Sequence, residues 1–98
     1  MSALLLSPAA RGDLAEIWQY TARRWDADQA ERYTGEIVSA CRELAAGHRR
    51  GRSIDDIRRG YFKLVVGSHL LIYRLNTVGE FEIIRILHQR MDIPERLQ

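Results

Sequence analysis

Apolar residues recur at helical spacing through the first half of the chain, after a short apolar run at residues 3–6. Ser7 and Pro8 then have the form of a helix N-cap followed by proline at the first helical position, where its missing N–H costs nothing. The apolar positions that follow are three or four residues apart, as one face of an α-helix requires. They are Leu14, Ile17, Trp18, Thr21 and Trp25. The pattern predicts a short strand at 3–6 and a helix at about 8–25.

A second helix is indicated directly after the first. Asp26, with Gln29 three residues on, forms a capping-box pattern, and Gly47 is a typical C-terminal stop. Between them lies a second apolar stripe, made of Ala30, Tyr33, Ile37, Cys41 and Leu44. Gly35 interrupts this helix at a cost of about 1 kcal/mol relative to alanine, so we expect it at a point of close packing. Because almost no loop separates the two helices, they should form a tight hairpin.

In the second half of the chain the apolar period changes from helical to alternating, which is typical of β-strands. Strands are predicted at 61–66, 69–75 and 80–87, with turns at Gly67 and 76–79 and a last helical turn at 94–97. The result is an α+β fold, in which a short N-terminal strand and a helical hairpin pack on an antiparallel sheet of three to four strands. The sheet face opposite the hairpin is expected to be at least partly open and to be the working surface.

Symmetric closure of the last hairpin around residues 76–79 predicts how its strands pair. Arg74 would lie opposite Phe81, and His69 would lie opposite Ile86. Because side chains alternate across a sheet, one face would carry Leu70, Ile72, Arg74, Phe81, Ile83 and Arg85. The other face would carry His69, Leu71, Tyr73, Glu82, Ile84, Ile86 and His88. Both faces are mixed, so the pattern leaves open which of them the helices cover.

The composition fits one globular domain spanning residues 1–98. Hydrophobic residues make up 46% and charged residues 29% of the chain, which excludes an intrinsically disordered protein. The formal net charge is only +2, so we expect no basic module that binds nucleic acid directly and sequence-specifically. Lys63 is the only lysine among 15 basic residues. Arginine grips carboxylates and phosphates with a planar set of donors, although a GC-rich genome would also raise the arginine count.

Cys41 is the only cysteine, which excludes an intramolecular disulfide and fits a reducing cytoplasm. Its place on the inner face of the second predicted helix indicates a buried structural thiol. The apolar run at 3–6 is too short for a signal peptide or a membrane span, so we expect no contact with a membrane. The chain has neither zinc-type Cys/His spacing nor a glycine-rich nucleotide loop, so we expect no metal and no other cofactor.

Two histidines are candidates for chemistry. His88 is either an acid–base group or a histidine hydrogen-bonded at a strand end, for which Asp92 is a candidate partner. The second interpretation is favoured because no other general acid or base is clearly paired with His88. His69 begins a strand, where it either joins that chemistry or caps the turn at 67–68.

A cluster of arginines and a set of aromatic residues are candidates for binding. Five arginines between residues 49 and 59, less two aspartates, leave a net charge of +3. Such a segment either binds phosphate or an acidic protein segment, or is a solvated loop. Trp18, Trp25 and Tyr33 lie on the helical stripes and are expected in the core. The groove between the two helices is of the apolar kind that accepts a partner helix.

Four stretches of the chain together carry a family pattern. The first runs from Leu6 to Tyr20, the second from Trp25 to Tyr33, the third from Gly51 to Arg74, and the last from Arg85 to Asp92. In this order and spacing they cover nearly the whole chain. They resemble ParE toxins of the RelE/ParE superfamily of bacterial toxin–antitoxin systems.

The resemblance implies the toxin of a type II toxin–antitoxin system, which inhibits DNA gyrase by protein–protein contact and is not an enzyme. It also implies a ParD-like antitoxin whose C-terminal segment folds over the helical hairpin and the sheet edge. The alternative within the superfamily is a ribosome-dependent mRNA endonuclease of the RelE or YoeB type. Leu70 and Gln89 stand where those enzymes carry an active-site arginine and a catalytic tyrosine, which favours the gyrase inhibitor.

Clustering and family position together assign two binding surfaces and no catalytic residue. The surface that faces the target is expected at Arg58, Arg59, Arg74, His88 and Arg90. The surface that faces the antitoxin is expected at Trp18, Tyr33, Arg49 and Arg50. The expected partners are therefore a ParD-like antitoxin and DNA gyrase.

Overall fold

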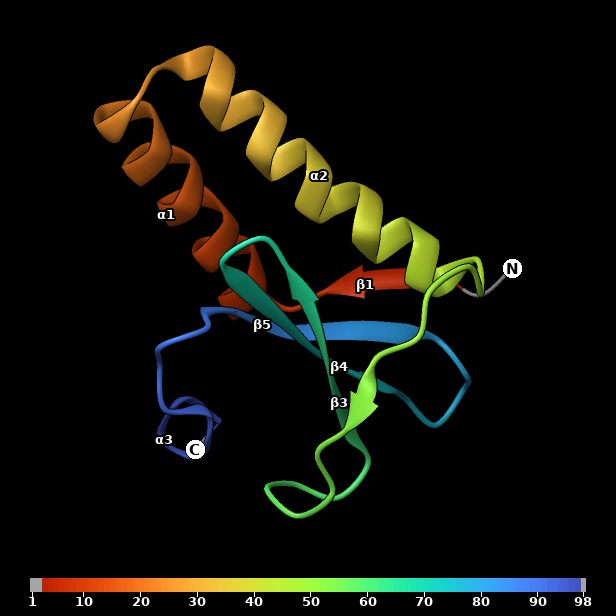
Figure 1. The fold of residues 1–98 in the computed structure, drawn as a ribbon. Coiled ribbons are helices and arrows are strands. Elements are labelled where there is room, and N and C mark those ends of the chain that lie inside the picture. The colour runs from red at the N-terminus through yellow and green to blue at the C-terminus, as the bar shows by residue number, and fades with distance from the viewer. Residues whose placement is uncertain (1–2, 98) are drawn as a thin grey trace.

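A computed structural model describes residues 3–97 and shows a helical hairpin laid across one face of a β-sheet (Figure 1). In chain order the elements are β1 (Leu4–Leu6), α1 (Pro8–Arg24), α2 (Ala27–Ala45), β2 (Arg52–Ser53), β3 (Tyr61–Val66), β4 (His69–Leu75), β5 (Phe81–His88) and α3 (Ile93–Arg96). The predicted α+β class and order of elements are confirmed. Within the described residues, no helix is both long enough and apolar enough to cross a bilayer.

The ends of the two long helices follow from local sequence. The Ser7 hydroxyl accepts a hydrogen bond from the backbone N–H of Ala10 at 3.0 Å, as an N-cap does. The Asp26 carboxylate caps α2 in the same way, accepting from the N–H of Gln29 at 2.7 Å. Gly47 adopts a φ of +82° just past α2, a conformation that favours glycine. The predicted helix boundaries are therefore confirmed.

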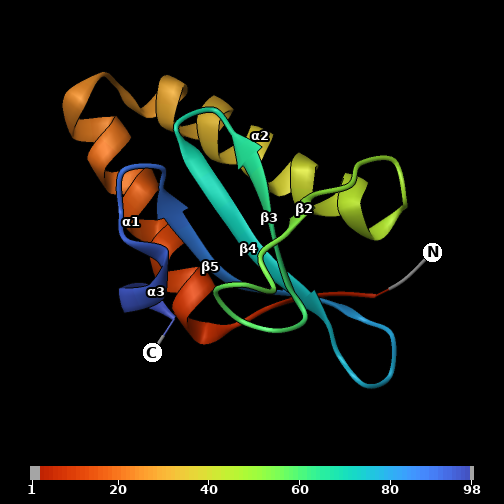
Figure 2. The same ribbon diagram turned by 60° about the horizontal axis from the view of Figure 1, so that its bottom comes forward.

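The sheet has five strands rather than three to four, in the order β1-β5-β4-β3-β2 (Figure 2). The extra strand is β2, which lies in the basic linker and pairs antiparallel with Phe62 and Lys63 of β3. At the other edge β1 pairs in parallel with residues 81–83 of β5, so the sheet is mixed. The sequence pattern missed β2 because a two-residue exposed strand has no alternation to detect.

The predicted register of the β4–β5 hairpin is wrong. The turn closes between Asn76 and Glu80, and this places Arg74 opposite Glu82 instead of Phe81. A β-bulge then leaves Ile84 without a partner on β4, so that His69 lies opposite His88 instead of Ile86. The extra residue in a bulge shifts the alternation of all later residues in its strand, so their side chains switch faces compared with an unbulged strand. The position of a bulge cannot be read from the alternation of apolar residues alone.

The bulge decides which residues face the helices. Phe81 and Ile83, before the bulge, and Ile86, after it, all pack in the core between the sheet and the helices. Both the helices and the sheet contribute buried residues to this core. Among them are Ile17, Ile37, Cys41, Leu44, Leu71 and Tyr73. The predicted grouping of Phe81 and Ile83 with Leu70 is therefore wrong.

The opposite face of the sheet is a second core and not an open surface. Leu70, Ile72 and Leu87 are at most 7% exposed there. The loop between β2 and β3 covers them with Ile54, and the C-terminal segment covers them with Leu97. Figure 1 shows that loop and α3 on the side of the sheet away from the two long helices. The expectation that this face is at least partly open is thus wrong at the centre of the sheet, because both segments fold back over it.

Cys41 is a free, buried thiol, as predicted. Burial disfavours the thiolate and raises the pKa of Cys41 to about 11, with a backbone hydrogen bond acting in the opposite direction. We expect the native protein to resist modification by a thiol reagent such as Ellman's reagent at mildly alkaline pH, and the urea-unfolded protein to react at once. Equal reaction rates in the two states would contradict this burial.

Candidate functional site

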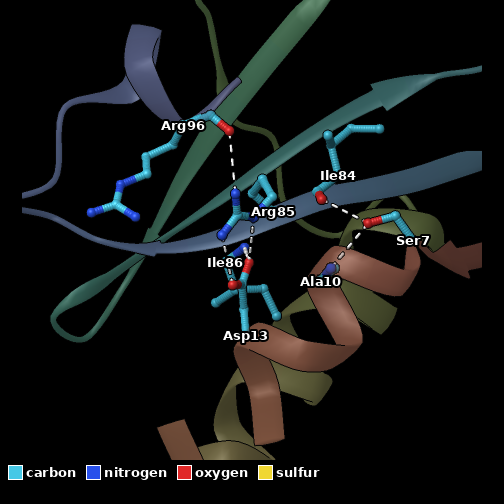
Figure 3. Close-up of polar contacts among 7 residues, drawn as sticks. All are labelled: Ser7, Ala10, Asp13, Ile84, Arg85, Ile86 and Arg96. Atoms are coloured by element: carbon cyan, nitrogen blue, oxygen red, sulfur yellow. Dashed lines mark hydrogen bonds and ion pairs between the residues drawn. The ribbon is translucent and has the colours of Figure 1, made fainter. Parts of the chain in front are cut away.

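Ser7 joins the start of α1 to the edge of β5. Its backbone N–H donates to the carbonyl of Ile83 at 3.0 Å, and its hydroxyl donates to the carbonyl of Ile84 at 2.7 Å. The same hydroxyl oxygen caps α1 through Ala10 (Figure 3). β1 ends at Leu6, so Ser7 continues the pairing of β5 through the bulge and positions α1 beside the strand.

Asp13 and Arg85 form an ion pair that joins α1 to β5 (Figure 3). Arg85 donates to the two carboxylate oxygens of Asp13 from Nε and Nη2, each at 2.8 Å. Asp13 also accepts the backbone N–H of Ile86 at 2.9 Å, and Arg85 donates from Nη1 to the carbonyl of Arg96 at 3.2 Å. The network therefore connects α1, β5 and the C-terminal segment. Its partners are 72 residues apart, so no local pattern could have predicted it.

A pocket of about 630 Å³ opens beside this network, between α1, the start of α2, the β3–β4 turn and the end of β5. Its lining includes three large hydrophobic residues with exposed side chains, Tyr20, Trp25 and Met91. The prediction that Trp25 belongs to the core is wrong, since 69% of it is exposed. It follows the last turn of α1, where the hairpin turns away from the sheet (Figure 1).

Tyr33 ties α2 to the β3–β4 turn at the inner end of the pocket. Its hydroxyl oxygen accepts the backbone N–H of Ser68 at 3.0 Å and lies 2.6 Å from Nδ1 of His69. Its ring packs against Gly67, whose φ is +58° and where a Cβ would lie only 2.7 Å from the ring. Tyr33 therefore points inward. The turn is fixed by Tyr33 and not by a histidine cap.

His88 lies directly across the sheet from His69, and the two rings meet nearly edge to face at 5.4 Å between centroids. Nδ1 of His88 accepts the backbone N–H of Arg90 at 3.1 Å. A hydrogen-bonded histidine at the strand end was predicted, but its partner is this backbone group and not Asp92. Both histidines line the pocket.

The pKa of His69 is lowered, first by burial and then by the neighbouring His88, while Asp13 acts weakly in the opposite direction. The unfolded chain, with an ordinary histidine pKa near 6.5, therefore binds a proton more readily than the folded protein. This contribution to the free energy of unfolding is fully present above about pH 6.5 and is lost as the pH falls through the folded pKa.

We therefore expect urea unfolding to show a stability that decreases as the pH falls below about 6.5. A His69→Asn variant should show a shallower decrease, because it removes the titrating group. The matched variant His48→Asn changes an exposed histidine outside the pocket and should keep the original slope. Identical slopes in all three proteins would show that His69 does not carry this pH dependence.

The residues predicted to face the target fall into two groups. Arg58 and Arg74 both lie over the ring of Tyr61, with their guanidinium carbons 5.1 and 5.9 Å from its centroid. Arg59 is an exposed neighbour of this group. His88 and Arg90 lie at, and just beyond, the open end of the β4–β5 hairpin. At the usual rise per residue of a strand, this end is about 17 Å along β4 from Arg74. The structure does not bring all five residues together.

Two of these arginines also have partners within the chain. Arg58 donates from Nη1 to the carbonyl of Leu97 at 2.6 Å, which ties the C-terminal segment to the β2–β3 loop. Arg74 donates to the carboxylate of Glu82, its cross-strand neighbour, at 2.8 Å. Their side chains thus contribute to the fold as well as to the charged surface.

The residues predicted to face the antitoxin lie in three places. Trp18 lines a groove of about 800 Å³ between α1 and α2, and its Nε1 donates to Glu31 across the groove at 3.0 Å. Arg49 lines a separate groove between α2 and β3 and pairs with Glu43 at 3.6 Å. Arg50 is exposed beyond α2, and Tyr33 lies in the pocket described above. The predicted groove between the helices is therefore present, with Trp18 in its wall.

The chain has the family sequence pattern and the fold of the toxin of a type II toxin–antitoxin system. A solved structure entitled "Chromosomal ParDE TA system from P. aeruginosa" superposes with a TM-score of 0.77 at 22% sequence identity, covering 90% of this chain and 96% of that one. The family model described as "ParE toxin of type II toxin-antitoxin system, parDE" matches residues 4–93. The chain belongs to the ParE toxin family.

Curated relatives agree over nearly the full length. Toxin ParE1 of Mycobacterium tuberculosis is 50% identical over 96 residues, which is 98% of each chain. Toxin ParE1 of Caulobacter vibrioides is 37% identical over 87 residues, covering 89% of this chain and 88% of the relative. Toxin ParE of Escherichia coli is 32% identical over 98 residues, covering 99% and 94%. The resemblance inferred from the sequence is thus confirmed.

Proposed function

We propose that this protein is a growth-inhibiting toxin that acts in the cytoplasm by protein–protein contact with DNA gyrase and is neutralised by a ParD-like antitoxin. The observation that carries the proposal is full-length identity of 50% to a ParE toxin. The structural neighbour, whose title names a ParDE system, supports an antitoxin partner of the same kind.

The surroundings of Leu70 and Gln89 favour this proposal over the mRNA endonuclease. Leu70 is 7% exposed and belongs to the second core, so a cation at its position would have no access to a scissile phosphate. Gln89 replaces the catalytic tyrosine and is exposed. The remaining His88 and Arg90 lack the arginine and the tyrosine that such an endonuclease uses, and the ring beside His88, that of His69, is hydrogen-bonded to Tyr33.

The proposal is tested with purified protein and purified gyrase in a DNA cleavage assay. We expect cleaved DNA to accumulate only when gyrase is present, and we expect addition of the antitoxin to abolish this accumulation. Arg59→Ala and Arg90→Ala, one exposed arginine from each group, should reduce cleavage, while Arg23→Ala on α1 should not. Ribosome-dependent mRNA cleavage without DNA breaks would overturn the proposal. If all three variants gave the same amount of cleaved DNA, neither arginine group would belong to the target surface.

The groove between α1 and α2 is proposed to receive the antitoxin's C-terminal segment, with Trp18 as its anchor. Truncating a hot-spot tryptophan at an interface costs about 2 kcal/mol or more, so Trp18→Ala should weaken antitoxin binding at least about thirtyfold. Trp25→Ala is the matched control, because Trp25 lies in the pocket and not in this groove. Calorimetric titration of both variants measures the difference, and an equal loss in both would contradict the placement.

A further inference from the structure

The pocket beside His69 and His88 has no part in the contacts proposed above for Trp18. Its chemistry is set by which ring nitrogens carry protons. Nδ1 of His88 accepts a backbone N–H, that of Arg90, so this nitrogen carries no proton. The proton of the neutral ring must then be on Nε2, and His88 presents an N–H donor there.

The same assignment follows for His69. The Tyr33 oxygen already accepts the N–H of Ser68, and within residues 3–97 its own proton has only Nδ1 of His69 as an acceptor. The roles of the two atoms depend on the His69 tautomer. We assign the tautomer protonated on Nε2, because Tyr33 then donates to Nδ1 and its proton has a partner within the protein. Burial favours the neutral ring and keeps this arrangement in place near neutral pH.

Both Nε2 atoms are open to solvent. Neither makes a hydrogen bond among the described residues, and none of the described side chains has a buried nitrogen or oxygen without a partner. Solvent therefore reaches both atoms, and both rings line the pocket. The pocket thus has two N–H donors in its lining, on rings whose centroids are 5.4 Å apart, and no acceptor among the described residues is assigned to them.

These donors are suited to an oxygen ligand and not to a metal ion. An imidazole binds a metal through an unprotonated nitrogen, and here Nδ1 of both rings is occupied while Nε2 carries the proton. Among the described residues no three metal-ligating side chains come together either. A carboxylate, in contrast, accepts hydrogen bonds from two N–H groups at once.

The walls of the pocket are mainly apolar. Ile17 and Ile86 lie at its inner side, and the exposed rings of Tyr20 and Trp25 extend the apolar surface outward. Asp13 is neutralised by Arg85, which leaves Glu16 as the one other carboxylate in the lining. A pocket of this size and polarity is typical of sites for small ligands with one anchoring polar group.

We propose that this pocket binds a carboxylate carried on an aromatic or aliphatic group, with the Nε2–H groups of His69 and His88 holding the carboxylate and Trp25 contacting the apolar part. Two sources offer this chemistry: a free small carboxylic acid and the C-terminal carboxylate of a polypeptide that ends in an apolar residue. The inference concerns a site separate from the helical groove and does not rest on gyrase as the target.

The test titrates the folded protein with 3-phenylpropionate and with its neutral amide, followed by NMR shifts of backbone amides. We expect the acid to bind in the millimolar range and the amide at least about tenfold more weakly, because hydrogen bonds to a charged group are the stronger ones. His88→Ala should weaken acid binding by a similar factor, and His48→Ala should leave it unchanged. Glu16→Gln should tighten acid binding roughly threefold by removing a like charge.

A second pair of probes separates the two sources. The tripeptide acetyl-Ala-Ala-Phe is compared with its C-terminal amide: binding of the acid form assigns the site to a polypeptide terminus, and binding of 3-phenylpropionate alone assigns it to a small molecule. The proposal is overturned if neither acid binds. It is also overturned if the acid and its amide bind with equal affinity and His88→Ala leaves both affinities unchanged. Thermal melting of each variant confirms that the protein remains folded.

Discussion

Replacing Asp13 with alanine is expected to lower the free energy of unfolding by about 3 kcal/mol. The change leaves the guanidinium of Arg85, a side chain that is only 24% exposed, without its counter-charge. It also removes the acceptor of the Ile86 backbone N–H. Both groups lie at the contact of α1 with β5, so the loss falls on the junction that positions the helical hairpin. Urea unfolding followed by circular dichroism measures the effect.

Two variants separate the network from simple loss of a charge. Glu16→Ala removes a carboxylate one turn further along α1, where the side chain is exposed, and should change stability by less than about 0.5 kcal/mol. Asp13→Asn keeps one oxygen for Ile86 but loses the ionic contact, so its effect should lie between the other two. If Asp13→Ala and Glu16→Ala destabilise equally, the contact with Arg85 does not stabilise the fold.

Replacing Gly51 with alanine is expected to lower the free energy of unfolding by about 3 kcal/mol through overpacking and a lost hydrogen bond. A Cβ at this position would lie 2.4 Å from the backbone carbonyl oxygen of Lys63 and 2.7 Å from the hydroxyl of Tyr73. The backbone must therefore move. Movement breaks the hydrogen bond of 2.8 Å from the Gly51 N–H to that hydroxyl, which belongs to a tyrosine only 4% exposed.

Gly35→Ala is the matched control for Gly51→Ala. Gly35 was predicted to lie at a point of close packing, and that prediction is wrong, since a Cβ there would meet nothing within 4 Å. The substitution should stabilise α2 by up to about 1 kcal/mol, because alanine has the higher helix propensity. A loss of stability at Gly51 together with a gain at Gly35 would confirm that, of these two positions, only Gly51 is closely approached by other atoms. Destabilisation by both would instead indicate an unexpected crowding of α2.

The arginine-rich composition does not translate into an equally rich free surface. Arg58, Arg74 and Arg85 each donate to an oxygen within the chain, and Arg49 pairs with Glu43. A lysine at the first three positions would lose the planar set of donors that stacks on Tyr61 or grips Asp13 from two nitrogens. Arginine count is therefore partly explained by the fold itself, in addition to any role in binding a target.

The sequence by itself determined the elements whose signals are local. Helix caps at Ser7 and Asp26, the stop at Gly47 and the alternation of β3 and β4 depend on neighbours within a few residues, and all appear as predicted. Family membership was equally readable, because it rests on residue types in order along the whole chain. Neither kind of property requires knowing which distant residues meet in the fold.

Only the tertiary structure decided how distant parts of the chain meet. The bulge at Ile84, the cover over the second sheet face and the exposure of Trp25 all depend on competition between many contacts of similar energy. The pairing of Asp13 with Arg85, and the meeting of His69 with His88 and Tyr33, join residues from different parts of the chain. A register shift of one residue reverses which side chains face the helices, and no local pattern carries enough energy to fix it.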